Sequence, residues 1–283
     1  MRYTDLACEK CTDKLAQYND KLKYGCQEVV ININSNKKQQ KYGLNRGNYY
    51  FLSCSNLKSM APIVCDYIIE QVANYLRLEI KKKLKNKLAN VLVVGLGNQN
   101  LVSDSLGVRV TQKLVVTDNR QDDINLSAFC PGALGQTGID TANLVKSVVQ
   151  LAKPNLVILV DSLCALSTSR LGSSVQVSDA GIVPGGAIGG NGQVINSKFL
   201  GVPTISIGVP LVVKTETIID DVLSSLSDNV EELNSSVHKN FKNFLVTPTD
   251  IDTLVKMNAE IISSAINMSV LELSLNEQRL ILL

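Results

Sequence analysis

Residues 156–161 read Leu-Val-Ile-Leu-Val-Asp, five apolar residues in succession followed by a carboxylate. A short apolar run rich in β-branched residues is typical of a strand buried on both faces, as in parallel sheets. Val91–Val94 is a second run of this kind. Between them, Asp140 or Thr141 can cap a helix that ends before Pro154. Strands that alternate with helices predict an α/β fold with a parallel-rich central sheet flanked by helices.

The outer parts of the chain suggest a division into three regions. Pro62 opens a segment with helical apolar spacing, and Thr249–Ile266 reads as a C-terminal helix. Ser173–Val177 alternates like a half-exposed strand, and Thr204–Ile207 reads as a short strand. We therefore expect a polar N-terminal region at 1–60, an α/β domain at 61–268 and a C-terminal tail at 269–283.

Composition excludes several classes of protein. The 283 residues are 45% hydrophobic and 19% charged, with a net charge of only +2, so the chain is globular and has no strong field for nucleic acid or membrane surfaces. No apolar run is long enough for a transmembrane helix, and the residues after Met1 never reach a signal-like apolar segment. We expect a cytoplasmic protein.

The cysteines and the single histidine limit the possible chemistry. Seven scattered cysteines without an export signal are most simply free thiols. Cys8 and Cys11 have CxxC spacing, but a zinc site needs further ligands that the neighbouring sequence lacks. His238 alone makes histidine-based metal or triad chemistry hard to build. We expect neither a metal nor a cofactor.

Candidate chemistry lies where strands end, because ligands of open α/β sheets bind at the carboxyl ends of the strands. Gly95–Asn100 follows the first run and leads to Asp104, but its GxGxxN pattern is a weak dinucleotide fingerprint. Asp161 ends the second run and could serve a cleft or simply cap the residues that follow. Two glycine-rich loops, 131–138 and 178–190, could approach a substrate backbone or an oxyanion, or could be flexible surface loops.

Taken together and in chain order, these segments resemble the germination (spore) protease family. The motifs that carry the resemblance are Gly95–Asn98, Asp104–Gly107, Pro131–Ile139, Val160–Leu163, Gln176–Gly185 and Gly201–Pro210, with Phe244–Pro248 near the C-terminus. Thr4-Asp5-Leu6-Ala7, followed by Glu9, looks like the family's zymogen-processing region and predicts a short propeptide cut at the Asp5–Leu6 bond.

The resemblance implies an endopeptidase that starts the degradation of small acid-soluble spore proteins during germination. It also implies a zymogen, a homotetramer located in the spore core, and the phosphorylase/hydrolase-like fold of hydrogenase-maturation endopeptidases. The catalytic aspartates of the family map onto Asp104 and Asp161, one acting as general base and one as general acid on a water molecule. We expect the substrate chain to be bound by the glycine-rich motifs at Gly97, Asn98, Gly135, Thr137, Gly138, Ser178, Asp179, Gly181 and Gly185.

Departures from the family pattern leave alternatives open. Val183 stands where the family has histidine, and Leu166 stands where it has an arginine that could tune a nearby carboxylate. The chain is therefore a diverged member, and a weakened or non-catalytic paralogue that acts as a sporulation regulator is one alternative. A hydrogenase-maturation-type peptidase is another, although no histidine lies near the motifs to bind nickel. Cys130 and Cys164 lie beside the motifs and leave a thiol nucleophile as a minor possibility.

Overall fold

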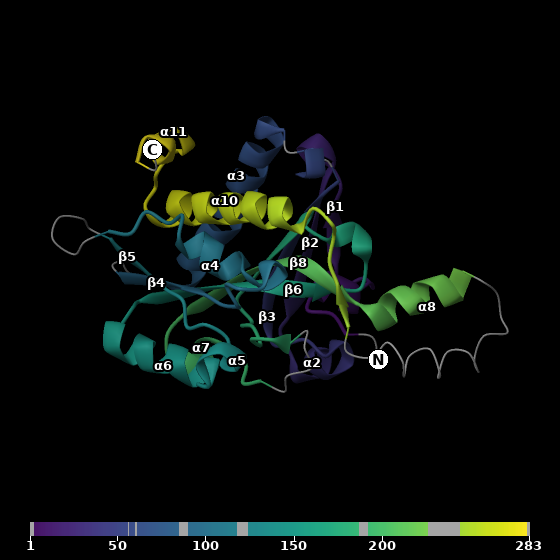
Figure 1. The fold of residues 1–283 in the computed structure, drawn as a ribbon, viewed down its shortest axis with the longest axis horizontal. Helices are drawn as coiled ribbons and strands as arrows, with labels where there is room; N and C mark the ends of the chain where they lie inside the picture. The colour runs from purple at the N-terminus through teal and green to yellow at the C-terminus, as the bar shows by residue number, and fades with distance from the viewer. Residues whose placement is uncertain are drawn as a thin grey trace.

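The computed structural model describes residues 3–55, 57–59, 61–84, 90–117, 124–186, 192–225 and 244–281. His238 and residues 187–190 of the second glycine-rich loop lie outside these ranges. The described chain forms one sheet with helices on both faces, as Figure 1 shows. None of the described helices combines the length and the apolar composition needed to cross a membrane.

The sheet is mixed, with a parallel centre. Its strands run in the order β1-β2-β3-β7-β8-β6-β4-β5, and β9 pairs with β8. β5, β4, β6 and β8 are mutually parallel, whereas the remaining pairings are antiparallel. The predicted parallel, helix-flanked core is therefore confirmed, within a sheet that is mixed as a whole. The strands are β1 (Gln17–Asn19), β2 (Cys26–Ile33), β3 (Gly47–Cys54), β4 (Asn90–Gly95), β5 (Asn125–Phe129), β6 (Leu156–Ala165), β7 (Ser174–Ser178), β8 (Thr204–Lys214) and β9 (Leu245–Val246).

Helices cover both faces of the sheet. Figure 1 shows α3, α4 and α10 on one face and α5, α6 and α7 on the other. The helices are α1 (Ala7–Lys10), α2 (Asn36–Tyr42), α3 (Pro62–Lys83), α4 (Leu106–Thr111), α5 (Leu134–Thr137), α6 (Thr141–Ala152), α7 (Ser197–Leu200), α8 (Thr215–Ser225), α10 (Ile251–Val270) and α11 (Leu275–Ile281). Short 3₁₀ turns lie at Lys23–Gly25, Leu57–Ser59, Val102–Asp104 and Thr168–Arg170.

Three apolar clusters hold these layers together. Under α3, α4 and α10, one cluster spans the sheet and includes Val93, Ile158 and Ile207. The opposite face carries two separate clusters: Val94 and Leu159 pack with α6 and α7, while Leu163 packs with the N-terminal segment and the β2–β3 hairpin. Side chains alternate between faces along a strand, so Asp161 shares the face of Leu159 and Leu163 and lies at the seam between these two clusters.

The central strands are longer than their sequences indicate. We expected strands that end near Asp161 and Ile207, but β6 continues to Ala165 and β8 to Lys214. The extension is stabilised because the two strands go on pairing with each other and bury Leu163 and Val213 against the N-terminal segment. Asp161 is therefore inside a strand, one residue beyond the last β6 residue that pairs with β4.

The polar N-terminal residues contribute to the same sheet. β2 pairs with β3, and β3 pairs with β7, which joins this hairpin to the parallel centre. β7 is buried along its whole length rather than half-exposed, because the N-terminal segment covers the face that carries Gln176. At the other end of the chain, Gln278 of α11 is buried and bonds to the α10 backbone. Whether 61–268 forms a domain by itself stays a prediction.

Candidate active site

Asp104 and Asp161 line the same cavities, near the point where β4 ends and β6 continues. Asp161 projects from β6, and Asp104 closes the 3₁₀ turn that follows the Gly97–Asn98 bend. The Asn98 backbone N–H donates to Asp104 Oδ2 over 2.8 Å, and the Ser162 backbone N–H donates to Asp161 Oδ1 over 2.8 Å. Gly97 permits the bend, because its φ is +106° and a Cβ there would lie 2.0 Å from the Asp104 carbonyl oxygen.

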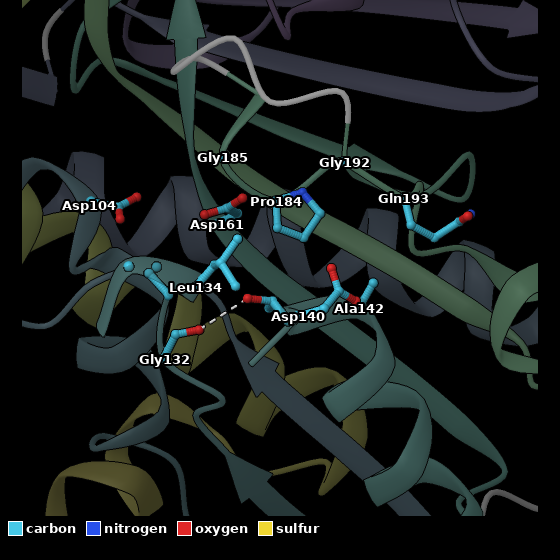
Figure 2. A pocket seen from close by; sticks show the side chains of 14 residues that line it. Asp104, Gly132, Leu134, Asp140, Ala142, Asp161, Pro184, Gly185, Gly192 and Gln193 are labelled. Carbon is cyan, nitrogen blue, oxygen red and sulfur yellow. Dashed lines mark hydrogen bonds between the residues drawn. The ribbon is translucent and has the colours of Figure 1, made fainter. Parts of the chain in front are cut away.

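Both carboxylates line a cavity of about 500 Å³. Half of its lining residues are glycine or alanine, so backbone groups are accessible in it, and Asp140, Thr141 and Gln193 add polar side chains. Figure 2 shows Asp161 beside Pro184 and Gly185 of the second glycine-rich loop. Such an opening, walled by small residues and ending at two carboxylates, is suited to an extended peptide.

A smaller cavity adjoins the aspartate pair. Its volume is about 40 Å³, which is enough for a water molecule with polar neighbours. Asp5, Asp104 and Asp161 all line it, together with Val183 and Leu245. A carboxylate from the N-terminal segment is thus the third acidic group at this point.

Burial perturbs both aspartates, and repulsion from Asp104 adds to the shift of Asp161. Burial raises the pKa of Asp104 to about 6, although the Asn98 N–H opposes the shift. Asp161 is only 4% exposed, and burial, followed by repulsion from Asp104, raises its pKa well above the usual range. The more buried Asp161 therefore holds its proton more tightly, and Asp104 ionises first. Unequal proton affinity within a carboxyl pair permits one acid and one base at the same pH.

The other predicted site residues fall into two groups. Gly97, Gly135 and Gly185 line the large cavity, and Thr137 lines an adjoining one of about 270 Å³ that shares Gly97. Asn98 acts through its backbone on Asp104, and Gly138 adopts a left-handed conformation that ends α5.

Ser178, Asp179 and Gly181 lie outside the lining of the large cavity. The Ser178 hydroxyl donates to the Asn48 carbonyl, and the Asp179 carboxylate accepts from the Asn48 N–H and pairs with Lys83. Gly181 packs against the backbone at Ile195. These residues anchor the base of the glycine-rich loop to β3 and α3.

The segment around Asp5 is bound along the edge of β6 that β4 leaves unpaired. Asp5 N–H donates to the Cys164 carbonyl over 2.9 Å, and Cys164 N–H donates to Asp5 Oδ2 over 2.8 Å. Gln176 Nε2 donates to the Asp5 carbonyl over 3.2 Å, while Ala7 N–H donates to Gln176 Oε1 over 2.8 Å. Leu6 is fully buried. Of the two predicted processing residues, Asp5 therefore lies beside the aspartate pair, and Leu6 packs in the apolar cluster that contains Leu163.

Glu9 ties the same segment to the loop after β6. Its carboxylate accepts from the Leu166 N–H over 2.7 Å and from the Ser167 N–H over 3.2 Å, and it pairs with Arg170 at 3.2 Å. Sequence reasoning assigned no site role to Gln176 or Arg170, and it assigned Asp140 only the role of a helix cap. The signal for Gln176 was its polar side chain between Val175 and Val177, but that alternation only indicated a solvent-facing side.

Two other kinds of chemistry at the site are a thiol nucleophile and a bound metal ion. Burial raises the pKa of the Cys164 thiol to about 12, which disfavours the thiolate that a nucleophile requires. Among the described residues, no group of three or more His, Cys, Asp and Glu side chains is arranged to hold a metal ion.

Comparisons of the sequence with known proteins agree on one family. The sequence profile described as Germination protease matches residues 12–239. A germination protease of Caldanaerobacter subterraneus subsp. tengcongensis is 36% identical over 259 residues, which cover 75% of this chain and 80% of the relative. A germination protease of Clostridium tetani is 30% identical over 275 residues, covering 85% and 84%. One of Clostridium acetobutylicum is 28% identical, covering 95% and 94%.

Among solved structures, the [NiFe] hydrogenase maturation protease HycI from Thermococcus kodakarensis KOD1 aligns with a TM-score of 0.36 and 16% identity. The alignment covers 67% of this chain and 98% of that protein.

Proposed function

The chain belongs to the germination protease family and is an endopeptidase, and on this premise we propose that it hydrolyses spore proteins with a water molecule activated by Asp104 and Asp161. The observation that carries the proposal is the pair of perturbed carboxyl groups that share a water-sized cavity and open into a larger cleft. A carboxyl pair with unequal proton affinities can supply both a base and an acid.

The environments of the two carboxyl groups support a division of roles. Ionised Asp104 takes a proton from the water, whose oxygen then attacks the scissile carbonyl carbon. Protonated Asp161 donates its proton to the leaving nitrogen as the C–N bond breaks. The proton held by Asp104 then restores Asp161, so the pair returns to its starting state. Because the groups interact, the two apparent pKa values belong to the pair.

The docked N-terminal segment supports processing at the Asp5–Leu6 bond. Asp5 lines the small cavity together with both aspartates, and one hydrogen bond from its backbone and one to its carboxylate hold it against Cys164. In this arrangement the segment occupies the position that a substrate needs, so cleavage would both activate the enzyme and clear the site. We therefore include the zymogen as part of the proposal.

The substrate class, the assembly and the location follow from the family. We propose small acid-soluble spore proteins as substrates, because an extended chain fits a cleft walled by glycine and alanine backbone. We further propose a homotetramer in the spore core. Family membership is the support for these two points.

The test is cleavage of a purified small acid-soluble spore protein, with fragments mapped by mass spectrometry. We expect Asp104→Asn and Asp161→Asn to lose activity, and Cys164→Ser and His238→Ala to retain it, each variant being checked for folding and assembly. A compact unrelated domain serves as the control substrate and should be cleaved far more slowly. Activity in either Asn variant would contradict the aspartate mechanism, and an inactive wild type would favour the non-catalytic alternative.

A further inference from the structure

One side chain contacts the backbone on both sides of the bond proposed for processing. Gln176 lies in β7 and is 8% exposed. Its Nε2 donates to the carbonyl oxygen of Asp5, and its Oε1 accepts from the N–H of Ala7. The Asp5 carbonyl is the acyl group of the Asp5–Leu6 bond. The Gln176 amide therefore touches the reacting carbonyl and the residue two positions after it.

We propose that Gln176 is a catalytic residue of this peptidase, whose Nε2–H group holds the scissile carbonyl and stabilises the negative charge that develops on its oxygen. The inference rests on the proposed processing of the Asp5–Leu6 bond. When water adds to a peptide carbonyl, the oxygen becomes an alkoxide, and a fixed donor aimed at that oxygen lowers the barrier. The donor is in place before the reaction, at 3.2 Å from the ground-state oxygen.

Sheet register puts this donor on the same face as the acid. Gln176 and Asp161 both pair with Gly208 of β8, one from each side. Residues in register on neighbouring strands project their side chains from the same face. The Leu163 side chain covers Gly208, so Gln176 and Asp161 lie on either side of Leu163 on one face of the sheet. Asp5, whose carbonyl Gln176 holds, lines the small cavity together with both aspartates.

The second hydrogen bond explains why the amide orientation is defined. An amide side chain can present either its oxygen or its nitrogen, and hydrogen-bond partners decide between them. The Ala7 N–H can only donate, so it takes Oε1 and leaves Nε2 facing the Asp5 carbonyl. Ala7 stays in the apolar cluster beneath the hairpin, on the far side of the cleaved bond. Once Asp5 leaves, the same Nε2–H is available to the carbonyl of an incoming substrate.

The experiment follows cleavage at Asp5–Leu6 in full-length chains made by cell-free synthesis and transferred to buffers from pH 5 to 8. Intact-mass spectrometry measures the rate. Gln176→Glu keeps the acceptor for the Ala7 N–H but has no donor for the Asp5 carbonyl when it is ionised. Gln176→Met has a side chain of similar length and makes neither hydrogen bond. We expect each to slow cleavage by about 100-fold at pH 8, since one donor to an oxyanion is worth about 100- to 1,000-fold. Gln27→Glu, at an exposed position of β2, is the matched control and should match the wild type.

The pH dependence separates catalysis from a structural role. The carboxyl group introduced by Gln176→Glu again has an O–H donor when it is protonated, so the rate of this variant relative to the wild type should recover at acidic pH, whereas that of Gln176→Met should not. Wild-type rates in Gln176→Glu at pH 8, or no recovery at pH 5 in a folded protein, would overturn the proposal. If Gln176→Glu does not fold, Gln176→Met decides: a wild-type rate refutes the role, and a loss of tenfold or more supports it.

Asp161→Asn in the same assay keeps the two proposals distinguishable. Continued cleavage in that variant would refute the aspartate mechanism while the Gln176 comparison still stands. A wild type that never cuts at Asp5–Leu6 would overturn both the processing and the role of Gln176. Normal cleavage in Gln176→Glu and none in Asp161→Asn would refute the role of Gln176 alone.

Discussion

Asp104→Asn should stabilise the folded protein at neutral pH while it abolishes activity. The folded environment raises the pKa of this carboxyl group from 3.8 to about 6, mainly because the group is buried. A pKa raised by folding means that the folded state prefers the protonated form. Protonated Asp104 therefore contributes to the free energy of unfolding. This contribution is fully present below about pH 4 and is lost as the pH rises through about 6.

The size of the effect follows from that pH window. Each pH unit between the two pKa values changes the free energy of unfolding by about 1.4 kcal/mol, so ionised Asp104 destabilises the fold by about 3 kcal/mol at pH 7. Asparagine is nearly isosteric, carries no charge, and keeps an oxygen that can accept from the Asn98 N–H. We therefore expect Asp104→Asn to raise the free energy of unfolding by up to about 3 kcal/mol at pH 7 and to leave it unchanged at pH 3.5.

Urea unfolding followed by circular dichroism, at fixed protein concentration from pH 3.5 to 7.5, measures this difference. Asp20→Asn, at an exposed position, is the matched control and should show no comparable gain. Equal stability of Asp104→Asn and the wild type at pH 7, or a gain that is as large at pH 3.5, would refute burial of the charge as the cause.

Three further outcomes follow from the same contacts. The rate of spore-protein cleavage should rise as the pH increases through about 6, where Asp104 ionises, and a flat profile from pH 5 to 7.5 in a folded enzyme would count against Asp104 as the base. Gly97→Ala should lower the stability and reduce the cleavage rate by about 100-fold or more, because its Cβ would displace the Asp104 backbone. Gly135→Ala, whose Cβ would meet nothing within 4 Å, should leave the stability unchanged, and similar stability of the two variants would contradict this. Glu9→Gln should lower the free energy of unfolding by about 2 kcal/mol, because the amide loses the charge that pairs with Arg170 and keeps one acceptor oxygen where the N–H groups of Leu166 and Ser167 use two. Urea unfolding against the exposed Glu70→Gln measures this, and equal values for the two variants would refute it.

Local pattern was sufficient to identify the central strands and to single out Asp161 as a candidate, whereas the pairing of Asp104 with Asp161 came from the family resemblance and stays a prediction. The runs at 91–94 and 156–160 are apolar at every position, and only a strand covered on both faces accommodates such a run at that length. Asp161 comes directly after the second run, and a glycine bend precedes Asp104. Both features indicated polar groups at the carboxyl ends of the central strands. Pro62 and Asp140 likewise marked where α3 and α6 begin, because proline and capping residues act on their own helix.

Contacts between distant segments decided the rest. β6 extends past Asp161 because β8 and the N-terminal segment cover Leu163 and Ala165, partners that lie about 40 or more residues away in the chain. Residues 26–54 join the sheet through β7, although their own composition is polar and indicated no such pairing. Strand length and sheet membership depend on the neighbour across the ladder, which periodicity along one strand does not reveal.

The role of Gln176 and the pKa values of the aspartates depend on tertiary structure alone. An isolated Ser-Val-Gln-Val-Ser strand presents its glutamine to water, and only the docking of Asp5 and Ala7 turns that side chain into a backbone clamp. In the same way, the sequence by itself determined that Asp161 directly follows an apolar strand run and that Asp104 follows the glycine bend after another. Their proton affinities come from burial and, for Asp161, from the repulsion of Asp104 as well. Desolvation and Coulomb interactions depend on distance in space and not on separation along the chain.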